Sequence, residues 1–216
     1  MSTIILPDLI HARFIKIKSA RVYDLDESIA ASKYPMQVEP NPKATDLTPT
    51  ATKLAQSEAG AGHDNWLLGV RVAFDIDLTA KALIEAERYH FFDVVSCNST
   101  MHRITKFDLD KAYCAYTDPY MIERMKVLVD NYNSDPTPDN YLRVLYSNPA
   151  GFTYTMRITT NYRQLKTIYN QRKTHRLPEW REFTDWIRRL PHSELIIGAV
   201  ADYTENAPST WDRQVS

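Results

Sequence analysis

The segment from Trp66 to Leu78 constrains the fold most, because it has the clearest strand pattern in the chain. Its apolar residues alternate with polar or small ones, and they are Val70, Val72, Phe74, Ile76 and Leu78. This period of two is typical of a strand with one face toward a core. Residues 13–24 alternate in a similar way, and we interpret residues 152–158 as a further extended segment. The sequence therefore predicts a sheet.

Helical patterns accompany these strands. Residues 79–95, TAKALIEAERYHFFDVV, repeat apolar residues at helical spacing, and Asp118-Pro119 provides the cap and first turn of another helix. Shorter helices are predicted at 27–32, at 140–146 and from Pro178, whereas the proline-rich residues 34–52 predict an irregular polar loop. Because strands come early and helices late, we expect an α+β fold with a mixed sheet and several packed helices. One domain would span residues 1–203, followed by a tail at 204–216.

The segment from Thr159 to Phe183 is predicted to open with a helix that Thr159 or Thr160 caps. Helical spacing places one polar and one charged residue on its otherwise apolar-leaning face, which carries Asn161, Leu165, Ile168, Tyr169 and Arg172. The first interpretation of Arg172 is an ion pair with a carboxylate at the edge of the core, since half-buried charges are normally paired. The second is a ligand-binding polar strip with Asn161, Arg163 and Thr167.

The composition argues against several classes of function. The net charge is −1, so no bulk basic field indicates a duplex nucleic acid, and a local cluster must meet any anionic ligand. The two cysteines fit neither a disulfide framework nor a thiolate metal site, and we expect no metal. No signal peptide or apolar run of about 20 residues is found, and glycine-rich phosphate loops are missing. We therefore expect a soluble cytoplasmic protein with no membrane partner.

One cluster of residue types suits a phosphate group. Arg88-Tyr89-His90 ends the helical pattern of residues 79–95, and a polar run follows that contains Ser96, Asn98, Ser99, His102 and Arg103. Arginine forks and hydroxyl groups are the donors that phosphate oxygens prefer. The alternative is a solvated helix end, where the helix dipole also favours a cation. These residues alone leave both interpretations open.

Three motifs, in order, resemble those of the flavin-dependent thymidylate synthases over roughly residues 60–183. GHDNWLLG, followed by VAFDI at Val72–Ile76, is similar to the family's G-H-x-S-x-x-E-H segment and its strand. Arg88-Tyr89-His90, with STMHR at Ser99–Arg103, is similar to the R-H-R-x7-S signature and the S-x-R-Y that closes it. The third match is Pro149, NYRQL at Asn161–Leu165, Arg172 and EWREF, which is similar to the family's proline, N-A-R-S-L, arginine and A-Q-W-E-I.

This resemblance implies a flavoprotein that methylates dUMP at C5. FAD would be the cofactor, methylenetetrahydrofolate the carbon donor and NADPH the hydride source, in a homotetramer whose active sites are shared between chains. Position by position, it implies substrate contacts at Arg88, Ser99, His102, Arg103 and Arg172, and cofactor contacts at His90, Asn161, Arg163 and Thr167. It also implies that Arg172 is the catalytic arginine, since a cation at the uracil carbonyls would stabilise the charge that develops as C5 becomes nucleophilic.

The sequence also departs from the family pattern. Tyr89 and His90 stand where the signature has histidine and arginine, Leu68-Gly69 replaces the E-H pair, and Glu85 corresponds to a family glutamine. Two alternatives therefore stay open. One is the transfer of another one-carbon unit, such as a hydroxymethyl group, to a pyrimidine nucleotide, and the other is a non-catalytic nucleotide-binding protein.

Overall fold

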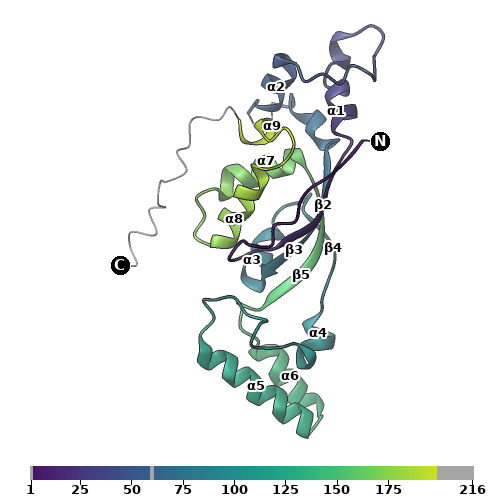
Figure 1. Ribbon diagram of the computed structural model, residues 1–216. Coiled ribbons are helices and arrows are strands. Elements are labelled where there is room, and N and C mark those ends of the chain that lie inside the picture. The colour runs from purple at the N-terminus through teal and green to yellow at the C-terminus, as the bar shows by residue number, and fades with distance from the viewer. Residues whose placement is uncertain (1, 59–60, 199–216) are drawn as a thin grey trace.

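The structure is a computed structural model that describes residues 2–58 and 61–198 (Figure 1). A five-stranded sheet with the strand order β1-β2-β3-β5-β4 forms its centre. The strands are β1 (Thr3–Ile5), β2 (Ile17–Tyr23), β3 (Arg71–Thr79), β4 (Asp93–Cys97) and β5 (Thr153–Asn161). The predicted α+β class is confirmed. The predicted tail at 204–216 and the end of the predicted domain lie outside the described residues.

The sheet is antiparallel in all its pairings among the described residues, rather than mixed as expected. β3 and β5 pair over the whole of β3, from Arg71 opposite Asn161 to Thr79 opposite Thr153. The alternation in β3 agrees with this arrangement, because antiparallel sheets can leave one face solvated, whereas parallel strands read as continuous apolar runs. The alternation in β3 therefore favours antiparallel pairing, and the prediction of a mixed sheet is wrong on this point.

The two faces of the sheet differ sharply in polarity. Phe74 and the other apolar residues of β3 point into the main core, which α7 (Tyr162–Arg172) and α8 (Pro178–Ile187) complete on one side of the sheet (Figure 1). Residues of the opposite face pair with each other across the strands, Arg157 Nη1 with Asp75 at 3.2 Å and Thr155 Oγ1 with Asp77 at 2.6 Å. One layer of helices therefore covers the apolar face, and polar pairs occupy the other.

The remaining helices flank this layer. They are α1 (Leu25–Ala31), α2 (Pro49–Ala55), α3 (Ala80–Ala86), α4 (Thr100–Arg103), α5 (Pro119–Ser134), α6 (Pro138–Ser147) and α9 (Glu194–Ile197), with single 3₁₀ turns at 34–36, 65–68 and 104–106. α5 and α6 pack beside the end of the sheet around a second, smaller core that includes Phe152 (Figure 1). The predicted polar loop ends in α2, because Pro49 takes the first helical position and Thr48 Oγ1 accepts from the Ala51 amide.

The helix predicted over residues 79–95 is too long. Helix α3 ends at Ala86, and residues 93–97 form the edge strand β4, which pairs with β5. Its two adjacent valines, Val94 and Val95, favour an extended backbone because they are β-branched. Phe92 fixes the intervening turn by packing against Phe183, with ring centroids 5.7 Å apart. Arg88 and His90 therefore lie on a turn rather than on a helix.

The predicted start of the helix after Thr159 is also wrong, by one or two residues. Thr159 and Thr160 belong to β5, and helix α7 begins at Tyr162. The cap is Asn161, whose Oδ1 accepts from the Gln164 amide at 2.9 Å. Because the strand continues to Asn161, the helix begins only at Tyr162, and the cap position falls on Asn161 rather than on either threonine. The strand thus runs directly into the helix, and this junction positions the candidate site.

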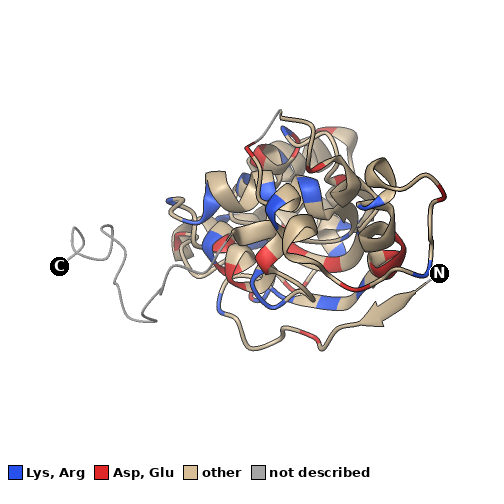
Figure 2. Cartoon of the chain, turned by 90° about the horizontal axis from the view of Figure 1, so that it is seen from above, with Lys and Arg blue, Asp and Glu red and all other residues tan. Residues whose placement is uncertain are grey.

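Charge is distributed without a dominant sign. Figure 2 shows lysine and arginine interspersed with aspartate and glutamate over the helices. Within residues 2–58 and 61–198, no helix combines the length and the apolar character needed to cross a bilayer. Recognition of an anionic ligand would therefore depend on a few locally grouped side chains.

Replacing Gly151 by alanine is expected to destabilise the fold by about 1–3 kcal/mol, because a new Cβ would overlap Thr117 Oγ1 and approach Cys114 Sγ to 3.2 Å. The measurement is the urea midpoint of Gly151→Ala compared with the unmodified chain. Combining Gly151→Ala with Thr117→Ala removes the hydroxyl and should restore part of the loss. Equal midpoints for the unmodified chain and Gly151→Ala would contradict the close packing at this position.

Candidate functional site

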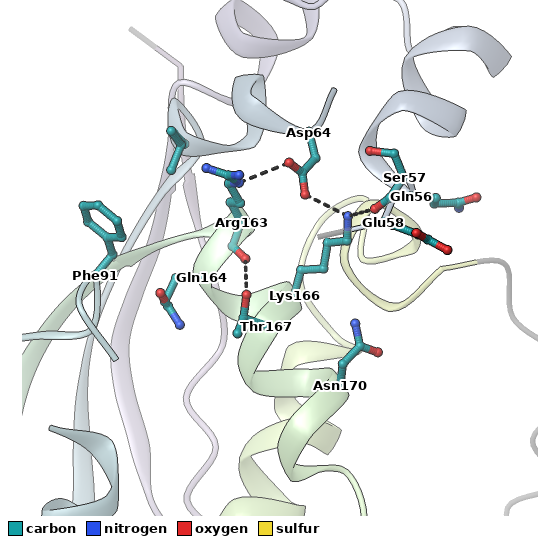
Figure 3. Close-up of a pocket in the computed structure, with 11 residues that line it drawn as sticks. Gln56, Ser57, Glu58, Asp64, Phe91, Arg163, Gln164, Lys166, Thr167 and Asn170 are labelled. Atoms are coloured by element: carbon teal, nitrogen blue, oxygen red, sulfur yellow. Dashed lines mark hydrogen bonds and ion pairs between the residues drawn. The ribbon is translucent and has the colours of Figure 1, made fainter. Parts of the chain in front are cut away.

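The N-terminal half of α7 and the turn at residues 87–92 meet around three adjoining cavities. The first, of about 300 Å³, lies between α7 and the end of α2 and is lined by Gln56, Ser57, Glu58, Asp64, Leu68, Phe91, Arg163, Gln164, Lys166, Thr167 and Asn170 (Figure 3). The second, of about 610 Å³, is lined by Tyr23, Leu68, Arg71, Val72, Ala73, Phe91, Asp93, Thr159, Thr160 and Asn161. The third, of about 280 Å³, is lined by Arg88, Tyr89, His90, Gln164, Thr167, Gln171 and Arg172.

The first cavity shares walls with each of the other two. Leu68 and Phe91 line both the first and the second, while Gln164 and Thr167 line both the first and the third. The first helical turns of α7 therefore stand among three neighbouring cavities, which we call together the hollow. Such a hollow, with apolar walls in one part and polar side chains in another, is typical of sites for organic ligands.

A buried charge cluster forms one wall of the first cavity (Figure 3). Asp64 is only 2% exposed and accepts from two cations of α7, Arg163 Nε at 3.1 Å and Lys166 Nζ at 2.9 Å. Lys166 Nζ also donates to the carbonyl oxygens of Ala55 at 2.7 Å and Ser57 at 2.5 Å, so all three of its protons have acceptors. The cluster attaches Ala55, Ser57 and Asp64 to α7 and fixes the direction of the Arg163 side chain.

Arg172 lies at the third cavity within a second network. It is 9% exposed, and its Nη1 donates to Glu85 Oε2 at 2.9 Å while its Nε donates to Tyr89 Oη at 2.7 Å. His175 Nε2 lies 2.7 Å from the same Nη1, and burial together with the Arg172 charge lowers the pKa of His175. The imidazole is therefore favoured in its neutral form beside the guanidinium.

This network agrees with the first interpretation of Arg172, because the arginine is paired with a carboxylate. It does not exclude a role toward a ligand, since Arg172 also lines the third cavity. Its neighbours account for one departure noted in the sequence. Glu85, which corresponds to a family glutamine, forms an ion pair with Arg172.

Comparison with known proteins identifies structures that share this fold. No protein-family model matches the sequence, and no curated protein matches it in a sequence search. Solved structures do match, and two of them are of ThyX from Helicobacter pylori, a flavin-dependent thymidylate synthase, in complex with FAD and dUMP. The first match has a TM-score of 0.63 at 14% identity and covers 85% of this chain and 98% of the other. The second has a TM-score of 0.61 at 16% identity and covers 84% and 95%. This chain has the fold of a flavin-dependent thymidylate synthase.

Within this thymidylate synthase fold, six of the nine predicted site residues meet around the shared hollow. Arg88, His90, Thr167 and Arg172 line the third cavity, Arg163 and Thr167 the first, and Asn161 the second. They come from the turn after α3 and from the last residue of β5 with the helix α7 that follows it, two segments that are far apart in the sequence. The structure thus brings together the residues taken from the first half of the signature and from the NYRQL motif. Their individual roles stay predictions.

The other three predicted residues lie elsewhere in the chain. Ser99, His102 and Arg103 belong to the start and end of α4, beyond the last residue of β4. The backbone nitrogen of Asn98 bonds to the Thr155 carbonyl, whereas Asn161 stands at the other end of β5. Within one chain of this thymidylate synthase fold, these three residues are therefore separated from α7 by the length of the β4–β5 pairing.

Sequence reasoning missed the residues that hold the predicted ones in place. Asp64 entered only as part of the GHDNWLLG segment, although it joins two cations of α7 across sequence separations of 99 and 102 residues. Lys166 and Phe91 were not singled out. No spacing rule connects residues so far apart, and the only available signal was an aspartate beside the histidine of the GHDN segment.

Proposed function

We propose that this chain is a flavin-dependent enzyme that reductively methylates dUMP at C5, with methylenetetrahydrofolate as carbon donor and NADPH as hydride source through FAD. One observation carries this proposal. Residues of the signature turn and of the NYRQL motif line one hollow, on a fold whose solved examples hold FAD and dUMP. No residue of the hollow has to act as a nucleophile, because FAD, when bound, supplies the redox chemistry.

The second cavity fits a planar ring system with polar edges. Its walls are largely apolar, with Phe91 and Leu68 on one side and Val72 and Ala73 on the sheet. Asp93, Thr159 and Asn161 place polar side chains along the same cavity. Asn161 and Arg163, at the adjoining start of α7, would hold the cofactor.

The nucleotide would occupy the third cavity. Arg88 and His90 are exposed on its rim and would meet the phosphate or the adjacent flavin, while Arg172 would face the pyrimidine carbonyls. We propose that a homotetramer completes this site, with Ser99, His102 and Arg103 supplied by the α4 segment of another chain. Their separation from α7 in a single chain supports that arrangement.

Titration with FAD tests the proposal at its first step. The purified protein is expected to be yellow, or to take up FAD with a shift of the flavin absorbance bands and quenching of tryptophan fluorescence. Unmodified lysozyme at equal concentration serves as the control for free flavin. A colourless protein that causes neither spectral change at saturating FAD would contradict the proposed function.

One observation favours a second candidate, a nucleotide-binding protein without turnover. The Glu85 carboxylate lies 2.9 Å from Arg172 Nη1 and partly neutralises the charge that would stabilise the reacting pyrimidine. Under this alternative dUMP binds with FAD present or absent, yet no modified nucleotide forms. Assay of dUMP binding by calorimetry, beside the assay of product, separates the two candidates.

A further inference from the structure

Tyr89 occupies a position that the resemblance leaves unexplained, because the family signature has histidine there. Its side chain is buried, only 8% exposed, between the exposed Arg88 and His90. Its hydroxyl accepts from Arg172 Nε at 2.7 Å and donates to Gln171 Oε1 at 3.0 Å. Tyr89 thus connects two consecutive side chains of α7, both of which line the third cavity.

The ring of Tyr89 also restricts Arg172. The guanidinium carbon lies 5.5 Å from the centroid of the Tyr89 ring and 4.9 Å from that of Trp180, so the cation packs against two adjacent aromatic side chains. On its remaining side Nη1 is occupied by Glu85 and His175. These contacts use Nε and Nη1, and none of them uses Nη2. Arg172 is thereby fixed with one nitrogen left for a ligand in the cavity.

The same hydroxyl orients Gln171. A phenol has one proton, and because Tyr89 accepts from Arg172, that proton is directed to Gln171 Oε1. The amide nitrogen of Gln171 is left as a donor. Two donors, Arg172 Nη2 and Gln171 Nε2, are therefore set by one hydroxyl. A ring that carries carbonyl oxygens, as a 2,4-dioxopyrimidine does, matches such a pair.

We propose that Tyr89 is a positioning residue, which aligns Arg172 and Gln171 so that both present hydrogen-bond donors to the carbonyl oxygens of a pyrimidine ring in the third cavity. The inference rests on the proposed function for the identity of the ligand. The alignment itself rests on the contacts of Tyr89. Tyr89 acts through its two neighbours and needs no contact with the reacting atoms.

The Tyr89→Phe variant tests the proposal, because it keeps the ring beside Arg172 and Trp180 and removes only the hydroxyl. A hydrogen bond to a charged group is strong enough that we expect kcat for dUMP to fall about tenfold or more, with KM changed less. FAD affinity should stay within about twofold, since Tyr89 does not line the second cavity. The matched control is Tyr113→Phe, which removes a hydroxyl bonded to Asn148 at 2.8 Å beside the smaller core and should leave kcat unchanged.

A second measurement is independent of turnover. The rate at which phenylglyoxal modifies Arg172, followed by peptide mass mapping, should rise several-fold in Tyr89→Phe and stay constant in Tyr113→Phe. Gln171→Met provides a variant with little effect on folding, since Gln171 is exposed, and should lower kcat in the same direction by a smaller factor. Unchanged modification rates in Tyr89→Phe would overturn the positioning role, as would unchanged kcat in an active protein. If the unmodified chain lacks turnover while the modification rate of Tyr89→Phe rises, the proposed function fails and the positioning role stands.

Discussion

Replacing Arg172 by alanine is expected to abolish formation of modified nucleotide and to lower the free energy of unfolding by about 3–5 kcal/mol. The side chains of Arg172 and Glu85 are only 10% and 19% exposed, so removal of the cation leaves a largely buried carboxylate without its strongest partner. The packing of the guanidinium against Trp180 is lost as well. Urea denaturation and product assay on the same preparation measure the two effects.

A double variant separates stability from chemistry. In Arg172→Met with Glu85→Gln, no unpaired charge remains, and replacement of both partners of a buried pair is often nearly neutral. We therefore expect the double variant to regain most of the stability while staying inactive. Glu85→Gln alone keeps a hydrogen bond to Arg172 and is expected to retain turnover. Turnover near the unmodified level in Arg172→Ala would show that Arg172 has only a structural role.

Replacing Asp64 by asparagine is expected to cost about 3 kcal/mol of stability and to weaken FAD binding at least tenfold. Asp64 is the carboxylate shared by Arg163 and Lys166, so the substitution leaves Lys166, which is 8% exposed, without its counter-charge and beside the partly exposed Arg163. Arg163 would also lose the contact that fixes its direction. Chemical denaturation measures the first effect and FAD titration the second.

The control for Asp64→Asn is Asp24→Asn. Asp24 forms a single ion pair with Arg71, whose side chain is 54% exposed, and such surface pairs contribute about 0–1 kcal/mol. If the two variants lose equal stability, the cluster at Asp64 does not behave as a buried one. Normal FAD affinity in a folded Asp64→Asn protein would show that the direction of Arg163 is unimportant for cofactor binding.

Local patterns predicted most of the fold. Alternation identified β3, and Asp118-Pro119 and Pro178 marked the starts of two helices correctly. The errors lie where tertiary contacts overrode a local pattern. The helical spacing after Thr79 continues past Ala86. Val94 nevertheless pairs with Ile158 of β5, so these residues form an edge strand instead of a helix. Likewise Thr160 could cap a helix but is used in strand pairing with Val72.

The candidate site was predicted in part, and for a physical reason. Arg88, Arg163 and Arg172 carry side chains suited to anions, and their order along the chain resembles a known family. The residues that hold these arginines in place could not be predicted from the sequence, because Asp64 and Tyr89 act through contacts between residues 82 to 102 positions apart. A turn aspartate and a buried tyrosine look ordinary until the fold sets them beside α7.

The most direct test of the proposed function is the mass of the nucleotide formed when the protein is incubated anaerobically with FAD, NADPH, methylenetetrahydrofolate and dUMP. The proposal predicts a product heavier than dUMP by one methylene unit that co-elutes with dTMP, and its loss when FAD or the folate is omitted. A product that carries a hydroxymethyl group, or dUMP recovered unchanged by a protein with bound FAD, would contradict it.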